Sequence, residues 1–225
     1  MRVKERKDKT QQGVQHRPLR RFVYRVLMAL IRVFIKLLFG LRVRNRVNVP
    51  LRGGVIIAPN HPTYLDPLFI GAALPRYVSF VAKRLVFRIP VLRTFLWLDE
   101  SIPIREFSAD VGAIRKCIRR LKAGDAVVIF PEGTRSNYGH LRPGLPGVAL
   151  IAMLSGAPII PCAIVNAYPA WRLSAPLPRP HWRVEVRFGE PINVEQCHGD
   201  KRDAILDDVT RRLMHIIRQL GEDEL

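Results

Sequence analysis

Short apolar runs alternate with longer amphipathic stretches along most of this chain. Apolar runs of four to eight residues bounded by turn-forming residues are typical of buried β-strands. Residues 42–48 alternate basic and apolar side chains and are expected to form an edge strand. Further strands are predicted over residues 55–58, 77–82, 101–104, 126–130, 159–165 and 182–188.

Helical segments lie between the predicted strands. The clearest are residues 108–123 and 200–220, where apolar residues recur every three or four positions. Ser108 is the expected N-cap of the first of these helices, because a serine side chain can accept a free backbone N–H. Shorter helices are predicted over residues 68–74 and 148–154.

The alternation of strands and helices indicates an α/β protein. We predict a single domain over residues 42–225, built on a mixed, largely buried β-sheet flanked by helices. Two segments precede it. Residues 1–18 are polar and mostly basic, so we expect a disordered arm there. Residues 19–41 are apolar but interrupted by charges.

The stretch 19–41 has the pattern of an amphipathic helix. At about 100° per residue its four cations fall on one stripe about 60° wide. No run of 18 residues lacks a charge, so a membrane-spanning helix is disfavoured. A basic helix lying in the membrane interface fits the pattern; the alternative is a helix packed on its own domain with solvated arginines. The four cations are Arg21, Arg25, Arg32 and Lys36.

Charge supports contact with an anionic surface. The chain has 37 Lys and Arg against 19 Asp and Glu, a formal net charge of +18, and residues 1–48 contribute +12 of it. Each cation near an anionic lipid surface adds roughly 1 kcal/mol of attraction. A nucleic-acid binder is the competing class, but the cations are interleaved with apolar residues and no nucleic-acid motif is present. We expect an anionic membrane surface as partner, no nucleic acid, and peripheral or monotopic association at the cytoplasmic face.

Cysteines and histidines give no sign of a disulfide or metal framework. Cys117, Cys162 and Cys197 are widely spaced, odd in number and without a CxxC pair, so we interpret them as reduced packing residues. No HxxxH or Cys/His ligand spacing indicates a metal. No Rossmann or Walker glycine pattern indicates a bound nucleotide. We therefore expect no metal and no cofactor.

Candidate chemistry follows the first predicted buried strand, where residues 60–66 read N-H-P-T-Y-L-D. Strand ends are where α/β enzymes usually carry their chemistry, and a histidine oriented by a carboxylate is suited to proton transfer. His61 and Asp66 meet only if the segment turns, which Pro62 favours by keeping His61 out of the helical region. The other interpretation is an ordinary helix start with Asp66 as N-cap.

A second polar loop follows the predicted strand at residues 126–130. Residues 130–136, from the end of that strand into the loop, read F-P-E-G-T-R-S. Arg135 offers a planar fork of donors that matches phosphate oxygens. Gly133 lets the backbone approach a ligand closely, and N–H groups near Gly133 and Thr134 are expected to add donors. The alternative is a plain turn in which Glu132 and Arg135 pair with each other.

The two motifs together resemble a known family. N-H-P-T-Y-L-D matches the NHx4D motif, and F-P-E-G-T-R-S the FPEGTRS motif, of the glycerolipid acyltransferases, which include the 1-acylglycerol-3-phosphate acyltransferases of phospholipid synthesis. Residues 158–161 resemble the family's later apolar-proline motif. Order and spacing agree, and the resemblance covers roughly residues 40–190. Two motifs of this length in this order are highly specific.

The resemblance implies a membrane-associated O-acyltransferase. His61, oriented by Asp66, would remove a proton from a glycerol hydroxyl, whose oxygen attacks the thioester of acyl-CoA or acyl carrier protein. With 1-acylglycerol 3-phosphate as acceptor the product would be phosphatidic acid. The acceptor's phosphate would be held by Glu132, Gly133, Thr134, Arg135 and Arg105. Supporting positions in the motifs are Asn60, Pro131 and Pro161.

The chain departs from the family pattern at two places. The family's second motif commonly has a glycine before a hydrophobic stretch that ends in arginine. Residues 100–106 lack this glycine, and in one alignment register Glu106 stands at the arginine position. Residues 144–147 lack the lysine that many members have before Pro-Gly. Less positive charge leaves the acceptor open: another lysophospholipid, a lyso-aminolipid or glycerol 3-phosphate. A non-catalytic membrane scaffold with the same fold is a further interpretation.

Overall fold

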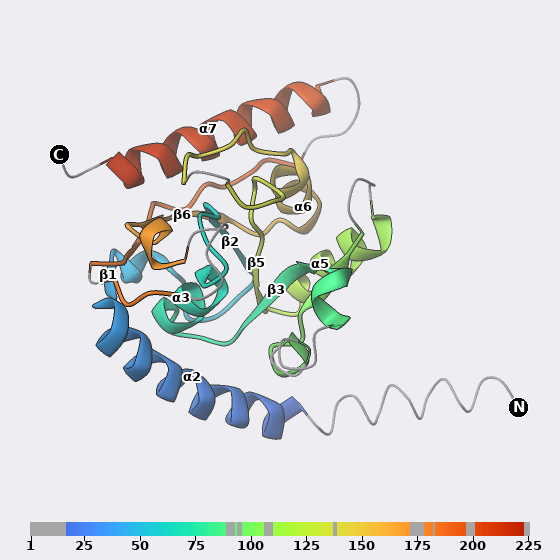
Figure 1. The fold of residues 1–225 in the computed structure, drawn as a ribbon. Helices are drawn as coiled ribbons and strands as arrows, with labels where there is room; N and C mark the ends of the chain where they lie inside the picture. Colours follow the sequence, from blue (N-terminus) through green and yellow to red (C-terminus); the bar gives the residue numbers. More distant parts are fainter. Residues whose placement is uncertain are drawn as a thin grey trace, which may run out of the picture.

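The computed structural model describes residues 17–88, 93, 96–105, 110–136, 139–171, 178–181, 183–196 and 201–222. This part of the chain contains a seven-stranded sheet with the order β1-β7-β6-β2-β5-β3-β4 (Figure 1). The strands are β1 (Arg42–Arg44), β2 (Val55–Pro59), β3 (Val78–Lys83), β4 (Ile102–Ile104), β5 (Ala126–Val128), β6 (Ile159–Val165) and β7 (Glu185–Phe188).

The sheet is mixed, which confirms the predicted fold class. Strands β6, β2, β5, β3 and β4 all run parallel to one another. Strand β7 runs antiparallel to β6, and β1 is parallel to β7. The carboxyl ends of the five parallel strands therefore share one edge of the sheet, which is where ligands bind in open α/β sheets.

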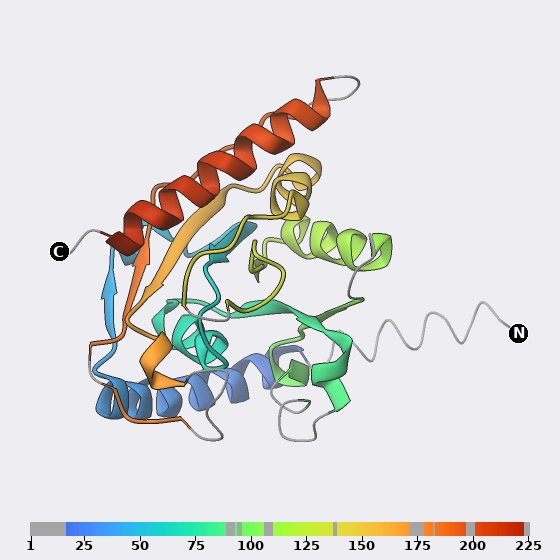
Figure 2. The same cartoon turned by 45° about the horizontal axis from the view of Figure 1, so that its top comes forward.

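Helices cover both faces of the sheet (Figures 1 and 2). Helices α2 and α3 lie on one face, and α5, α6 and α7 lie on the other. The helices are α2 (Arg17–Phe39), α3 (Asp66–Ala73), α5 (Val111–Lys122), α6 (Gly147–Ser155) and α7 (Arg202–Glu222). Short 3-10 helices are η1 (Arg46–Asn48), η2 (Arg84–Arg88) and η3 (Tyr168–Ala170).

Side chains of the central strands alternate between two cores. In β2, Val55 and Ile57 belong to the core under α2 and α3, whereas Ile56 and Ala58 belong to the core under α5, α6 and α7. All four are fully buried. A strand buried on both faces has a continuous apolar sequence, and this is the pattern from which β2 was predicted.

Among the predicted boundaries that differ from the structure, two have clear local reasons. The edge strand predicted at residues 42–48 ends at Arg44, because Asn45 adopts a left-handed backbone (φ 53°) and η1 follows. The helix α5 begins at Val111 rather than at Ser108, which lies outside the described residues. Its cap is Asp110, whose carboxylate accepts the N–H of Ala113 at 3.0 Å.

Several predictions fall on parts of the chain that the structure does not describe. The arm predicted at residues 1–18 lies outside the described residues up to residue 16, and α2 begins at Arg17. Trp182, the first residue of the strand predicted over residues 182–188, and Cys197 also lie outside them.

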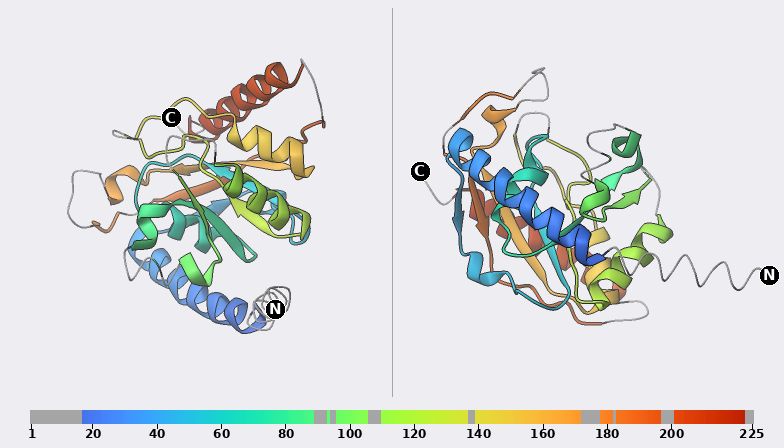
Figure 3. Two further views of the ribbon diagram at one scale, coloured as in Figure 1. Left: turned by 90° about the vertical axis from the view of Figure 1, so that its right-hand side faces the viewer. Right: turned by 90° about the horizontal axis from the view of Figure 1, so that it is seen from below.

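Helix α2 crosses one side of the molecule (Figure 3). Its two faces differ in the side chains that they carry. Its inner face packs against the domain through the buried side chains of Tyr24, Met28, Ile35 and Phe39. Its outer face carries large exposed apolar side chains within an arc of about 120°, at about 100° per residue. These side chains, which we call the outer face of α2, are Phe22, Val23, Val26, Leu30, Val33, Phe34 and Leu37.

Arg32 connects α2 to its neighbour. Its guanidinium donates to the carbonyl oxygens of Ala72 (2.7 Å) and Leu74 (3.0 Å), at the end of α3 where the last carbonyls lack helical partners. Arg32 is thus an intramolecular tether, although it is exposed like Arg25 and Lys36 of the same predicted stripe. In the described residues, no helix combines the length and the apolar character needed to cross a membrane.

Candidate active site

His61 and Asp66 come together at the carboxyl end of β2. The chain turns after Pro59, and Nδ1 of His61 lies 2.7 Å from Oδ2 of Asp66. Asp66 is completely buried, while the His61 side chain is 18% exposed. With Nδ1 turned toward the carboxylate, Nε2 is the ring nitrogen that faces away from it. If Nδ1 carries the proton, Nε2 can accept one from a substrate.

Asp66 orients the histidine and does not act as a helix cap. Helix α3 begins at Asp66 itself, and no side chain caps it. Instead, the carboxylate of Asp66 accepts the backbone N–H (2.8 Å) and the hydroxyl (2.6 Å) of Thr63. Three donors around one buried carboxylate fix its position. Thr63 is therefore a functional residue that sequence reasoning missed.

The FPEGTRS loop after β5 supports the His61 loop directly. Glu132 accepts the backbone N–H of His61 through Oε1 (2.7 Å) and that of Arg142 through Oε2 (2.9 Å). The N–H of Ser136 donates to the carbonyl oxygen of His61 (3.0 Å), and the His61 ring stacks on Phe130 with 3.9 Å between ring centroids. Burial raises the pKa of Glu132, although its two backbone hydrogen bonds oppose that shift.

Gly133 allows the tight backbone conformation of this loop. Its φ is +69°, and a Cβ at this position would lie 2.7 Å from Cδ1 of Leu145. Its N–H already donates to the carbonyl oxygen of Phe130 at 3.1 Å. Of the N–H groups expected to add donors near Gly133 and Thr134, that of Gly133 is therefore used by the turn itself. Thr134 lies next in the loop and is partly exposed.

Arg135 does not pair with Glu132, whose two oxygens are engaged elsewhere. Its guanidinium carbon lies 3.6 Å from the centroid of the Tyr64 ring. The Tyr64 ring in turn lies 5.1 Å from that of Trp171, which follows η3. Arg135 therefore stands beside the His61 loop, because Tyr64 belongs to that loop.

Arg105 lies farther from His61 than the other predicted residues. It follows β4, three strands from β2 in the sheet order, and at about 4.8 Å per strand this is roughly 14 Å. Its side chain is exposed, and its backbone N–H donates to Asp110. Lys83, at the end of β3, is one strand nearer. Sequence reasoning missed Lys83, although it directly follows a predicted strand.

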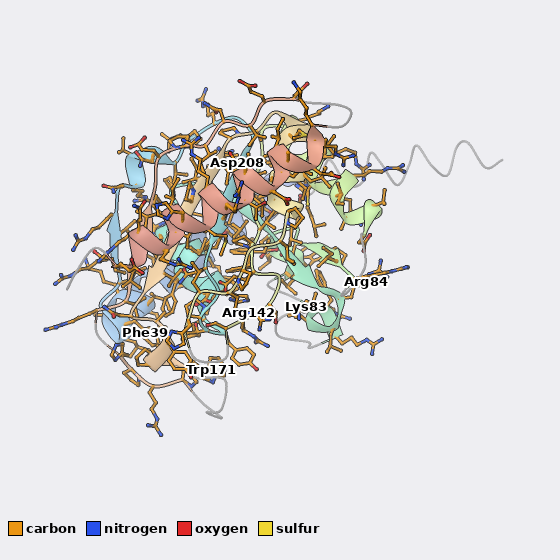
Figure 4. All side chains as sticks on the ribbon, turned by 90° about the horizontal axis from the view of Figure 1, so that it is seen from above. Phe39, Lys83, Arg84, Arg142, Trp171 and Asp208 are labelled. Atoms are coloured by element: carbon orange, nitrogen blue, oxygen red, sulfur yellow. The ribbon has the colours of Figure 1, made fainter. Side chains whose placement is uncertain are left out.

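Figure 4 shows the side chains of Trp171, Arg142 and Lys83 along one edge of the molecule. This is the edge at which the parallel strands end, because Lys83 is the last residue of β3. Arg142 is exposed, and its backbone is held by Glu132. The site therefore combines a histidine–carboxylate pair with several cations that sequence motifs alone did not bring together.

The remaining predicted residues shape the backbone. The side-chain amide of Asn60 accepts the N–H of Ile164 (2.6 Å) and donates to its carbonyl oxygen (3.2 Å), so it anchors the His61 loop to β6. The carbonyl oxygens of Pro131 and Pro161 each accept a backbone N–H at 2.8 Å. Among the described residues, no three His, Cys, Asp or Glu side chains gather as a metal site.

Comparisons with known proteins found similar sequences and a similar fold. A 1-acyl-sn-glycerol-3-phosphate acyltransferase from Bacillus subtilis is 30% identical over 142 residues, which are 63% of this chain and 70% of that protein. A chloroplastic enzyme of the same name from Brassica napus is 26% identical over 160 residues, 70% of this chain but only 45% of its own length. The crystal structure of the 1-acyl-sn-glycerophosphate acyltransferase from Thermotoga maritima has the same fold.

That structure matches with a TM-score of 0.72 and 22% identity, over 88% of this chain and 81% of its own. The model of the family described as Acyltransferase matches residues 40–165, which is more than half of the chain. This match includes both loops that form the site, those with His61 and with Glu132. The chain therefore belongs to the acyltransferase family.

Proposed function

We propose that this protein transfers a fatty acyl group from a thioester to the free hydroxyl of 1-acylglycerol 3-phosphate, giving phosphatidic acid. The observation that carries the proposal is the His61–Asp66 pair, with Nε2 of His61 turned away from the carboxylate and Arg135 beside the same loop. The relatives from Bacillus subtilis and Brassica napus are named for this reaction, which supports the choice of acceptor.

In the proposed mechanism His61 acts first as base and then as acid. Nε2 takes the proton from the acceptor hydroxyl while its oxygen attacks the thioester carbonyl. The tetrahedral intermediate collapses, the carbon–sulfur bond breaks, and the imidazolium gives its proton to the leaving thiolate. Asp66 holds the ring and stabilises its positive charge. General acid–base help of this kind contributes typically 10²–10⁴-fold, roughly 3–5 kcal/mol.

The acceptor's phosphate would bind to cations at the same edge of the sheet. Arg135 is the leading ligand because a guanidinium matches phosphate oxygens with two parallel donors. Lys83 and Arg142 lie on the same edge (Figure 4), and they offset the missing lysine near Leu145. The two carboxyl oxygens of Glu132 are engaged with backbone N–H groups, so we assign it a bracing role. Arg105 stays a distant candidate.

The proposed enzyme works at a membrane surface. The outer face of α2 is apolar, and Arg25 and Lys36 of the same helix are exposed. This combination suits a helix that lies in the interface with its apolar side in the lipid and its cations at anionic headgroups. We propose peripheral or monotopic association at the cytoplasmic face, with acyl-CoA or acyl carrier protein as donor and no cofactor.

The test is acyl transfer from a long-chain acyl-CoA to lysophosphatidic acid in liposomes. The wild type should form phosphatidic acid, and His61→Ala should lose on the order of 10²-fold or more. His215→Ala is the matched control, because this histidine is exposed on α7, on the other side of the sheet. It should keep full activity.

Other outcomes would separate the alternatives. Transfer to lysophosphatidylcholine, a lyso-aminolipid or glycerol 3-phosphate in preference to lysophosphatidic acid would show that the acceptor is wrong and the chemistry right. Faster transfer from acylated acyl carrier protein than from acyl-CoA would identify acyl carrier protein as the donor. Activity that survives His61→Ala would contradict the assigned base. A lack of acyl transfer with every acceptor and donor would favour a non-catalytic membrane scaffold.

A further inference from the structure

Tyr64 is the outward-facing residue of the loop between His61 and Asp66. Thr63, Leu65 and Asp66 are buried, whereas the Tyr64 side chain is 43% exposed. The neighbouring residues explain this direction, because Thr63 binds Asp66 and Leu65 packs in the core under α3. The backbone that positions the catalytic pair thus presents one aromatic ring at the edge of the site.

The Tyr64 ring contacts Arg135, the leading phosphate ligand. The guanidinium carbon lies 3.6 Å from the ring centroid, which is van der Waals contact between two flat groups. A stacked guanidinium is held through its face, so the N–H groups at its edge stay available. A carboxylate partner would instead occupy the N–H fork that a phosphate needs. Among the described residues, the Arg135 side chain has no ion pair or hydrogen bond partner beside its contact with Tyr64.

A free arginine side chain has many rotamers, and binding a phosphate would have to restrict them. The stack on Tyr64 restricts them beforehand. Trp171 packs on Tyr64 from a different segment, with 5.1 Å between ring centroids, and so limits the motion of the tyrosine. The three side chains come from the loops that follow β2 and β5 and from the segment after η3.

We propose that Tyr64 is a positioning residue, which holds Arg135 with its N–H edge ready for the acceptor's phosphate. This inference rests on the proposed function and adds a determinant of acceptor specificity within the catalytic loop. It also links proton transfer by His61 to the binding of the acceptor's phosphate. The loop that carries the base, His61, is the same loop that orients the arginine.

Steady-state kinetics with a short-chain, water-soluble lysophosphatidic acid tests the proposal without the influence of membrane binding. Tyr64→Leu should raise KM for this acceptor about fivefold to tenfold and leave kcat within about twofold. Tyr64→Phe keeps the ring and should keep KM. In an Arg135→Ala background the effect of Tyr64→Leu should disappear, because coupled residues are not additive. An unchanged KM in Tyr64→Leu, or an equal loss in the Arg135→Ala background, would overturn the proposal.

A second measurement does not depend on activity. The Nε–H signal of Arg135 in an arginine-selective NMR spectrum should be displaced by the ring current of Tyr64, and inorganic phosphate should titrate it. Tyr64→Leu should remove the displacement and weaken phosphate binding about fivefold or more; Tyr64→Phe should keep both. If the wild type does not acylate lysophosphatidic acid, the proposed function fails, and this titration still decides the role of Tyr64. Equal phosphate affinity in the wild type and Tyr64→Leu would overturn it.

Discussion

The carboxylate of Glu132 holds the two loops of the site together through hydrogen bonds to its two oxygen atoms. One oxygen accepts the N–H of His61 and the other that of Arg142. Burial raises the pKa of Glu132, so the protein keeps a carboxyl group in a place that disfavours its charge. The presence of a carboxyl group in such a place is best explained by the two backbone N–H groups that it holds in position. We infer that Glu132 acts on His61 and not on the phosphate.

Glu132→Gln tests this inference at constant side-chain size. An amide offers one acceptor oxygen and places an NH₂ group against one of the two N–H donors, so the His61 loop should lose its brace. We expect kcat to fall about 10- to 100-fold, which is roughly 1.4–2.7 kcal/mol, while KM for lysophosphatidic acid changes less than about twofold. The measurement is steady-state kinetics, with circular dichroism to show that the variant is folded.

Glu190→Gln is the matched control for this change, because Glu190 is exposed at the end of β7. It should leave both constants unchanged. A rise of KM with kcat unchanged in Glu132→Gln would instead place Glu132 among the phosphate ligands, as the family resemblance implied.

Residues near each other in the sequence were the predictable part of the site. His61 and Asp66 are five positions apart, so their spacing alone posed the question of a dyad. The bond between Glu132 and His61 spans 71 positions and depends on β2 and β5 being neighbours in the sheet. Local residue patterns do not predict the order of strands in the sheet. An apolar run shows that a strand is buried, but it does not show which strand lies beside it. The same reason explains why Lys83 was missed.

Elements were predictable where burial left a clear periodicity. Strand β6 was predicted with its observed bounds, since both its faces are buried. The cap of α5 was missed because Ser108 and Asp110 give the same local signal two residues apart. The structure uses Asp110, whose second oxygen also accepts the N–H of Arg105 at 3.1 Å. The Asp110 carboxylate thus caps the helix and also holds the backbone of the preceding loop.

The attachment of α2 to the domain gives a prediction at the same scale. Arg32 donates to two carbonyl oxygens at the end of α3, and this site is partly buried. Arg32→Ala should lower the free energy of unfolding by about 1–2 kcal/mol, because hydrogen bonds from a charged donor are lost. Urea denaturation measures the effect.

Arg25→Ala provides the comparison, since Arg25 is exposed on the same helix and carries the same charge. It should change the free energy of unfolding by less than about 0.5 kcal/mol. Equal effects of the two substitutions would show that α2 is held by its apolar inner face alone.

The whole molecule places the site and α2 on neighbouring sides. In Figure 1 α2 runs along the bottom, and Figure 4, seen from above, places Trp171, Arg142 and Lys83 on the side that faces the viewer of Figure 1. A protein that rests on a membrane through the outer face of α2 would hold this edge of the sheet upright next to the lipid surface. A lysolipid could then present its headgroup to the site while its chain stays near the membrane.

Vesicle binding tests this orientation with paired variants. Val26 and Leu30 belong to the outer face of α2 and are 47% and 65% exposed. The double substitution Val26→Gln/Leu30→Gln removes apolar surface that would enter the lipid, so binding to anionic vesicles should weaken on the order of tenfold or more. Flotation with vesicles of defined phosphatidylglycerol content measures the partition.

The control pair uses the same residue types on the other face of the sheet. Val111 and Leu154 lie on α5 and α6 and are 53% and 39% exposed. Val111→Gln/Leu154→Gln should keep vesicle binding, because these side chains point away from the membrane in the proposed orientation. Turnover of a water-soluble lysophosphatidic acid should stay unchanged in both double variants, since neither touches the site. If the control pair weakens binding as much as the α2 pair, the membrane contact is not the outer face of α2, and the neighbouring position of the site loses its proposed meaning.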